Sequence, residues 1–300
     1  SKVGSGTFVA ERDNADSSLI GILTPHVDSH VGNFISDSII SIKEALQNAG
    51  YCPIILEPPS GFWGERRSEE ELKLLKRLLK LGVRGVIADA SAAVNSPVWR
   101  YLKQMPLPVV CYNNCDDTND LNYVALDNYK AGRMVAQHFI DKGHRELAVV
   151  TTYCCDILSE VDRVRGFQDV MAENGLKAKI ISTRSINNYL EGMKSVPRKL
   201  NGITGIFGNN DLLTIQLMTA FRDAGYEIPQ QVSFVGFDDS LLCEHLQPRL
   251  TSVNQLSAYM GQRTAELLLD RLENKHDSRE TVQIRLVPKL TIRDSVSTIK

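Results

Sequence analysis

Long hydrophobic runs are missing from this sequence. Nowhere do about 18 apolar residues follow one another, the length that a membrane-spanning helix needs. An excess of either charge is also missing, since 34 basic and 36 acidic residues leave a formal net charge of −2 at pH 7. A chain so close to neutral has little electrostatic attraction for nucleic acid or an anionic membrane, so we expect neither as a direct partner of this stretch. No signal-peptide pattern opens the sequence, which favours the cytoplasm.

Cysteine is scarce, and its spacing matches no paired zinc-binding pattern. Two cysteines are adjacent, and another pair has three residues between its members, but neither arrangement is repeated. We therefore expect reduced thiols, no metal site and no cofactor. The cysteines are Cys52, Cys111, Cys115, Cys154, Cys155 and Cys243.

The motifs of common enzymes are absent as well. The sequence contains no Gly-x-Gly-x-x-Gly after a strand, no phosphate-binding Gly-x4-Gly-Lys-Ser/Thr, no His-Glu-x-x-His and no Gly-x-Ser-x-Gly. Asp238-Asp239 resembles a catalytic carboxylate pair, but adjacent residues at a strand end point in opposite directions and share a substrate poorly. We expect no catalytic residues and no enzyme.

What the sequence does contain is an alternation of buried strands and amphipathic helices, which predicts βαβ units and parallel sheets. The pattern runs through one series and then restarts, so the chain is long enough for two doubly wound lobes. The expected strands are Leu19–Leu23, Cys52–Leu56, Val83–Ala88, Leu107–Cys111, Tyr123–Leu126, Leu147–Thr151, Lys179–Ser182, Ile203–Phe207, Ser233–Asp239, Val282–Leu286 and Leu290–Arg293. The expected helices cover about 33–49, 98–103, 129–142, 163–173, 187–200, 212–224 and 256–274.

Two details refine this pattern. Ser68-x-x-Glu71 matches a capping box, which predicts the start of a further helix that ends before Gly82. The last two strands depart from simple alternation, and we expect them to return the chain to the first lobe and then to the second.

The stretch from Ile203 to Asp211 organises the second series. An apolar strand ends at Gly208, where the backbone turns, and Asn209, Asn210 and Asp211 follow before a helix. Ligands of open α/β sheets bind at the carboxyl ends of the strands, so these side chains are candidates to hold a polar small molecule. Capping of the following helix by Asn210 or Asp211 is the alternative, and both roles are compatible.

The first residues carry a separate signal. Val3-Gly4-Ser5-Gly6-Thr7-Phe8-Val9-Ala10 reads as a tight turn into a short strand. It resembles the last strand of the wing in GntR-type winged-helix repressors. The polar stretch that follows, Glu11–Ser18, is typical of a linker. The rest of a winged-helix domain is absent from this chain.

Phrases along the body, from about residue 18 to 297, resemble the effector-binding domain of the LacI/GalR family of bacterial repressors. The resemblance implies an α/β fold of two doubly wound parallel-sheet lobes joined by crossovers, as in type I periplasmic binding proteins. It implies residues 1–17 as wing and linker, 18–143 plus 256–287 as the N-terminal lobe, and 144–255 plus 288–300 as the C-terminal lobe. The phrases are Leu19-Ile20-Gly21-Ile22, Val83-Arg84-Gly85-Val86-Ile87, Leu126-Asp127-Asn128, Lys142-Gly143-His144-Arg145, Arg163-x-x-Gly166-Phe167, Gly208-Asn209-Asn210-Asp211, Val235-Gly236-Phe237-Asp238-Asp239 and Leu250-Thr251-Ser252-Val253.

The resemblance also implies effector contacts between the lobes. Arg163 of the Arg-x-x-Gly-Phe phrase offers a fork of donors to vicinal hydroxyls, with an exposed helix arginine as the alternative and Arg165 as the spare candidate. Asn210 and Asp238 end two strands of the second lobe, and Asp238 alternatively caps the next turn. Gln255 lies near a crossover and is placed to reach the cleft.

The first lobe supplies the remaining candidates. Pro25 and His26 follow the first strand, and His26 either bonds the ligand or is exposed. Asp127 and Lys130 lie near a strand end that faces the cleft in this family. Three aromatic residues are candidate apolar walls for a sugar face, with core packing as the alternative for each. They are Phe34, Trp99 and Tyr112.

The combination of a wing-like start and this body is similar to the arabinose repressors of Gram-positive bacteria. It implies a cytoplasmic, homodimeric repressor that binds a small sugar, with L-arabinose favoured, and releases operator DNA held by an N-terminal winged-helix domain outside this chain. A periplasmic-type sugar-binding protein of a transporter shares the two-lobe plan and is the alternative; the absent signal peptide and the wing-like start argue against it.

Overall fold

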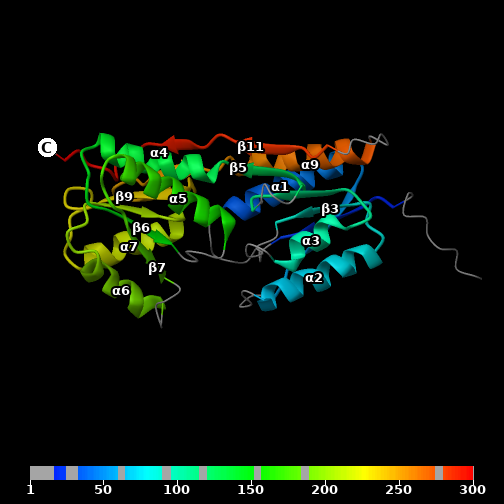
Figure 1. Cartoon of the computed structure of the whole chain (residues 1–300), viewed down its shortest axis with the longest axis horizontal. Coiled ribbons are helices and arrows are strands. Elements are labelled where there is room, and N and C mark those ends of the chain that lie inside the picture. The colour runs from blue at the N-terminus through cyan, green and yellow to red at the C-terminus, as the bar shows by residue number, and fades with distance from the viewer. Residues whose placement is uncertain are drawn as a thin grey trace, which may run out of the picture.

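The computed structural model describes residues 17–24, 33–59, 65–89, 96–114, 120–151, 157–183, 189–273 and 280–299. Within these ranges the chain forms two α/β lobes that lie side by side along the long axis of the molecule (Figure 1). The wing-like segment 3–10 lies outside the described residues, as do Pro25, His26 and the side chain of Phe34.

The first lobe is a six-stranded sheet in the order β11-β5-β4-β3-β1-β2, with every adjacent pair parallel. Helices α1 and α9 pack together on one face, and α2 and α3 pack on the other. Its strands are β1 (Leu19–Leu23), β2 (Cys52–Leu56), β3 (Gly85–Ala88), β4 (Val109–Tyr112), β5 (Asn122–Leu126) and β11 (Gln283–Leu286). Its helices are α1 (Asn33–Asn48), α2 (Glu65–Lys80), α3 (Pro97–Lys103) and α9 (Ser257–Glu273).

The second lobe repeats this plan in the order β12-β10-β9-β8-β6-β7. Only the β10–β12 pair is antiparallel among its described strands. Its strands are β6 (Leu147–Thr151), β7 (Lys179–Ser182), β8 (Gly205–Gly208), β9 (Ser233–Asp238), β10 (Thr251–Asn254) and β12 (Lys289–Thr291). Its helices are α4 (Asn128–Asp141), α5 (Leu158–Glu173), α6 (Tyr189–Lys199), α7 (Asp211–Asp223) and the single turn α8 (Leu242–His245).

Both sheets are apolar on both faces because helices cover both faces. In the second lobe, Phe207 and Phe237 pack on the α4–α5 side, while Ile206 and Phe234 pack on the α6–α7 side. The Phe207 ring stacks on Phe167 of α5, and Phe167 meets Phe139 of α4 edge to face. This two-sided burial confirms the predicted fold class. None of the described helices is long and apolar enough to cross a membrane.

The chain passes between the sheets three times in the described residues: after β5, after β10 and after β11. The tail therefore reaches the first sheet through β11 and the second through β12, as the late strands predicted. The boundary proposed at residue 143 stays a prediction, and α4, which precedes it, packs against α5 of the second lobe.

Three local expectations were wrong or incomplete. Helix α2 begins at Glu65, so Ser68 and Glu71 lie inside it and form no capping box. Their side chains bond instead to Ser96 and Arg67, at 2.9 and 2.8 Å. Helix α5 begins five residues before the predicted Arg163, at Leu158, because its polar first turn hides the helical period. The strand β10 and the short α8 were not predicted.

Candidate functional site

Arg163 is the centre of a group of polar residues at the carboxyl ends of the second sheet's strands and the start of α4. Its side chain is buried, with 6% of the residue exposed, although it comes from a helix. The guanidinium donates from Nε to Asn128 Oδ1 at 2.8 Å and from one terminal nitrogen to the Asn209 carbonyl at 2.9 Å. Its central carbon lies 3.5 Å from the centre of the Phe237 ring. The alternative of an exposed helix arginine therefore does not hold for Arg163.

Arg165, the spare candidate, is the exposed arginine. Its side chain is 62% exposed and pairs with Asp162 on the same helix at 3.0 Å. It also lies over the Tyr129 ring at 5.0 Å. The two arginines of this phrase thus occupy opposite environments, and only Arg163 contacts the residues at the ends of β8 and β9.

A close helix crossing fixes Arg163 in place. A Cβ built on Gly132 of α4 would lie 1.9 Å from the Arg163 carbonyl oxygen, and one on Gly166 of α5 would lie 2.0 Å from that of Tyr129. The two backbones therefore touch where both helices carry glycine. This approach brings the first turn of α4 within reach of Arg163, which explains the hydrogen bond to Asn128.

Burial and nearby charges shift the pKa values of Arg163 and Asp238. Burial lowers the pKa of Arg163 to about 10, while Asp238 and Glu160 oppose this shift. Burial raises the pKa of Asp238 to about 8, the negative charge of Asp211 adds to that rise, and Arg163 acts against it. Arg163 therefore carries its charge at neutral pH, and Asp238 titrates close to neutrality.

Asp238 and Gln255 lie side by side at the ends of adjacent strands. The Gln255 side-chain amide donates to Asp238 Oδ1. Asp238 has a backbone φ of 119°, a conformation that residues other than glycine rarely adopt. Gln255 is only 3% exposed, yet its Oε1 has no hydrogen-bond partner among the described residues.

A second buried acceptor lies at the end of β8. Asn209 is 1% exposed, and its Oδ1 also lacks a hydrogen-bond partner within the described parts of the chain. Strands β8, β9 and β10 are neighbours, so three adjacent strands end in buried or half-buried acceptor groups. Leaving such an acceptor unpaired costs roughly 1–3 kcal/mol, so this arrangement favours a bound group that donates hydrogen bonds.

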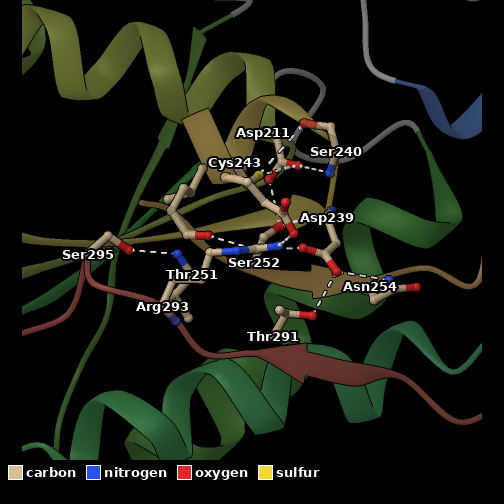
Figure 2. Close-up of polar contacts among 12 residues, drawn as sticks. Asp211, Asp239, Ser240, Cys243, Thr251, Ser252, Asn254, Thr291, Arg293 and Ser295 are labelled. Atoms are coloured by element: carbon tan, nitrogen blue, oxygen red, sulfur yellow. Dashed lines mark hydrogen bonds and ion pairs between the residues drawn. The ribbon is translucent and has the colours of Figure 1, made fainter. Parts of the chain in front are cut away.

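Asn210 and Asp211 have structural contacts. Asn210 is the N-cap of α7 and accepts from the Leu213 N–H at 2.8 Å, as the capping alternative predicted. Buried Asp211 accepts from Ser252 Oγ at 2.6 Å, from the Ser240 N–H at 2.7 Å and from Cys243 Sγ at 3.1 Å (Figure 2). Asp211 therefore ties three segments together beneath the site, and its charge acts on Asp238 from there.

Asp127 and Lys130 flank the first turn of α4. Asp127 caps this helix by accepting from the Lys130 N–H at 2.8 Å, and the Lys130 side chain is exposed. The residue between them that reaches Arg163 is Asn128, which the sequence reasoning did not single out. Its signal was its place at the carboxyl end of β5, directly after Asp127.

The aromatic candidates of the first lobe that the structure describes lie in the core. Tyr112 is fully buried, and its hydroxyl shares a 3.1 Å hydrogen bond with Thr24 Oγ1. Trp99 packs among the apolar side chains between α2, α3 and the sheet. Both positions agree with the packing alternative.

A polar group at the first lobe's strand ends was missed. Asp89, buried after β3, accepts from Asn113 Nδ2 at 3.0 Å and from Asn114 Nδ2 at 3.1 Å. Burial raises the pKa of Asp89 to about 6, against the lowering effect of these amides. Asn114 in turn accepts from Ser159 Oγ of the second lobe at 2.8 Å. The carboxyl edges of the two sheets therefore meet here. The sequence signal that could have predicted this group was an aspartate, Asp89, directly after a buried strand.

The structure thus brings Arg163, Asp238 and Gln255 together with Asn128 and Asn209. It leaves Lys130 and Arg165 in solvent and Tyr112 in the core. No group of three metal-ligating side chains occurs in the described ranges.

Comparison with known proteins identifies a family and several similar regulators. The family described as periplasmic binding protein-like domain matches residues 136–296. The HTH-type transcriptional regulator CelR of Thermobifida fusca is 29% identical over 58% of this chain and 52% of its own length, so this chain spans about half of that protein. The arabinose metabolism transcriptional repressor of Halalkalibacterium halodurans is 25% identical over 100% of this chain and 82% of its own.

A solved structure agrees in shape. The periplasmic binding protein/LacI transcriptional regulator of Alkaliphilus metalliredigens, complexed with D-xylulofuranose, has a TM-score of 0.73 and 26% identity. The match covers 95% of this chain and 100% of that one.

Proposed function

The chain belongs to the periplasmic binding protein-like domain family, and its relatives are transcriptional regulators rather than enzymes. On that premise we propose that it is the ligand-sensing domain of a bacterial transcriptional repressor that binds a small sugar between its lobes. L-arabinose is the favoured effector. Relatives named as regulators give no support to the transporter alternative.

The surplus of buried acceptors around Arg163 is the observation that carries this proposal. Gln255 Oε1 and Asn209 Oδ1 lack donors in the described residues, and the Asp238 carboxyl lies beside them. A sugar presents several hydroxyl donors on a small frame and satisfies such a set. A phosphate or carboxylate ligand would bring more acceptors and a negative charge next to Asp238, so we expect neither.

Two observations support L-arabinose among the sugars. One is the similarity to an arabinose metabolism repressor over the whole chain. The other is the wing-like segment Val3–Ala10. Its combination with a LacI-type body resembles the arabinose repressors of Gram-positive bacteria, which join a GntR-type DNA-binding domain to such a body. We place operator DNA in contact with such an N-terminal domain outside this chain.

The mechanism we propose is closure of the two lobes around the sugar. Arg163 already links α5 to the first turn of α4, just after a crossover, and Ser159 links α5 to the end of β4. A sugar that bonds Asp238, Gln255 and the first-lobe strand ends would favour the closed arrangement. In a homodimer that movement changes the spacing of the DNA-binding heads, and a coupling of about 1–3 kcal/mol is typical. We propose that the sugar releases DNA; stronger operator binding with sugar, measured by fluorescence anisotropy on the full-length protein, would reverse this sign.

The test is a thermal-shift screen of this chain against L-arabinose, D-ribose, D-xylose, D-galactose, D-glucose and hypoxanthine, followed by calorimetry on each hit. A ligand of the folded state must raise the melting temperature. We expect a pentose hit that Arg163→Met abolishes and that the exposed control Arg165→Met retains. A shift with hypoxanthine alone, or no shift with any sugar, would contradict the sugar-sensor proposal.

A further inference from the structure

Two consecutive aspartates end β9, and their side chains have different surroundings. Asp238 bonds Gln255 and lies close to Arg163, within the proposed effector site. Asp239 instead bonds Asn254 of β10, Thr291 of β12 and Arg293, which follows β12 (Figure 2). Both have positive φ, 119° and 56°, so the chain makes an unfavourable turn that its surroundings have to hold in place.

The Asp239 carboxylate is fully occupied by donors. Oδ2 accepts from Asn254 Nδ2 at 2.9 Å and from Thr291 Oγ1 at 2.7 Å. Oδ1 accepts from the Arg293 guanidinium at 2.7 Å, and the two side chains of this ion pair are only 8% and 9% exposed. The Asp239 N–H also donates to Ser252 Oγ at 3.1 Å, so backbone and side chain are both fixed.

Arg293 is anchored by more than this pair. The same guanidinium nitrogen donates to the Leu250 carbonyl at 2.9 Å, and the Arg293 N–H donates to Thr251 Oγ1 at 2.9 Å. Burial disfavours the charge of Arg293, but the hydrogen bond to Asp239, the charge of Asp239 and smaller contributions from Cys243 and Glu244 together outweigh it and raise the pKa of Arg293. The cation is thus held where β9, β10 and the segment after β12 meet.

The contacts of Asp239 also fix the backbone around Gln255, the hydrogen-bond partner of Asp238. Asn254, which donates to Asp239, accepts from the Leu256 N–H at 2.8 Å through its own Oδ1. Leu256 has a φ of 55°, so Asn254 stabilises a second unfavourable turn. Gln255 lies between these two residues. One set of contacts therefore fixes the backbone on both sides of the Asp238–Gln255 hydrogen bond.

We propose that Arg293 is a positioning residue for the effector site: by clamping Asp239 it holds Asp238 and, through Asn254, Gln255 in the arrangement that receives the ligand. This rests on the proposed function of that site. Arg293 itself touches no ligand-facing group, since its described contacts are Asp239, Glu244, Leu250 and Thr251. Its effect on binding is indirect and acts through the geometry of two turns.

A purely structural role, in which Arg293 only fastens β12 to the sheet, makes different predictions. It would lower the melting temperature and leave the affinity of the folded protein unchanged. A positioning role changes affinity under conditions where the variant is folded. It also changes how affinity depends on pH, because Asp238 titrates near neutrality only while it is held in its buried position.

The experiment is calorimetry with whichever of L-arabinose, D-ribose or D-xylose binds the wild type, on Arg293→Met, Arg293→Lys and Arg249→Met, from pH 6 to 9. Arg249→Met is the matched control, because Arg249 pairs with Asp294 in the same region at 2.6 Å but is more than half exposed. We expect Kd to rise by at least about tenfold in Arg293→Met, to recover in part in Arg293→Lys, and to stay unchanged in Arg249→Met.

The wild-type Kd should fall as pH rises towards 8, since the charged carboxylate accepts hydroxyl donors best, and Arg293→Met should flatten this profile. If Arg293→Met proves unfolded, Thr291→Val removes one donor to Asp239 and takes its place with a smaller expected loss. Wild-type affinity and an unchanged pH profile in a folded variant would overturn the positioning role alone. If the wild type binds none of the five sugars of the thermal-shift screen, the proposed function fails and this inference fails with it.

Discussion

The carboxyl edges of the two sheets carry similar residue types but use them differently. In the first lobe, Asp89 accepts from Asn113 and Asn114, so this carboxylate is paired by donors of its own lobe. In the second lobe, Asn209 and Gln255 bury acceptor atoms without donors in the described residues. Polar groups that satisfy one another need no further partner, whereas unpaired buried acceptors are satisfied by water or by a ligand. On the proposed function, the second lobe is therefore the principal binding surface and the first a preformed wall.

The same contrast appears in the buried carboxyl groups. Amide donors limit the effect of burial at Asp89, whose pKa rises to about 6. The pKa of Asp238 rises further, to about 8, because burial raises it and the negative charge of Asp211 adds to that rise. On the proposed function, a ligand that donates hydrogen bonds to Asp238 favours its ionised form and acts against this rise in pKa.

The largest effect is expected from a substitution at the α4–α5 crossing, because this crossing brings Arg163 within hydrogen-bond distance of Asn128. We expect Gly132→Ala to destabilise the protein by about 3 kcal/mol, because the new Cβ would lie 1.9 Å from a backbone oxygen that cannot move alone. Sugar binding should be lost as Arg163 moves from the site. Urea unfolding with Ala172→Ser, an exposed position on α5, as control measures the difference. A Gly132→Ala protein as stable as the wild type would show that the helices separate freely.

Substituting one aspartate in each lobe tests the comparison directly. At pH 9, where Asp238 is charged, Asp238→Asn should weaken sugar binding about 100-fold, since hydrogen bonds to a charged group contribute roughly 1.5–3 kcal/mol. Asp89→Asn should change the affinity only a few-fold, because its bonds run within its own lobe. Calorimetry on both variants, with melting temperatures to confirm folding, decides it. Equal losses in the two lobes would mean that the first lobe binds as strongly as the second.

Much of this architecture was predictable from the sequence because apolar strands and helices repeat with clear periods. The buried runs Leu19–Leu23 and Leu147–Thr151 appear as strands β1 and β6 with the predicted bounds. Strand β10 escaped prediction because Thr251 and Ser252 are polar residues whose side chains bond within the core.

The candidate site was predictable only in part. Arg163 and Asp238 were candidates from the family resemblance, and their role in binding stays a prediction. Asn128 and Asn209 became visible as partners of Arg163 only in three dimensions, since they reach it from other helices and strands. The role of Asp239 depends on Arg293, which lies far along the chain, and no local pattern encodes that pair.

The next prediction concerns pH and the stability of the ligand-free protein. The folded-state pKa of Asp238 is raised above its unfolded value of 3.8 to about 8, so between these values the folded state binds more protons than the unfolded state. Its contribution to stability therefore falls as pH rises through this window. Asp89 behaves alike, but only up to about pH 6. Between pH 6 and 8 the wild type should lose about 1–2 kcal/mol relative to Asp238→Asn, whereas Asp89→Asn should follow the wild type.

Urea unfolding of the three proteins at pH 6, 7 and 8 provides this measurement. Taking differences between variant and wild type removes the shared contribution of other titrating groups, such as His144, whose pKa burial lowers. Parallel profiles of unfolding free energy against pH for the wild type and Asp238→Asn would mean that the pKa of Asp238 is not raised on folding. The two lobes would then not differ in the pKa of their strand-end carboxyl groups.

The smallest expected effect is at the contact that joins the two edges. Ser159 Oγ donates to Asn114 Oδ1 across the lobes at 2.8 Å, and both groups are buried. Ser159→Ala should destabilise the protein by about 1 kcal/mol and weaken sugar binding a few-fold, because one link that holds the edges together is lost. The control is Ser195→Ala, whose hydroxyl bonds only within α6 at 2.7 Å. Tighter sugar binding in Ser159→Ala would mean that this bond holds the lobes in an arrangement that the ligand has to open, and the first lobe would then act as a lock.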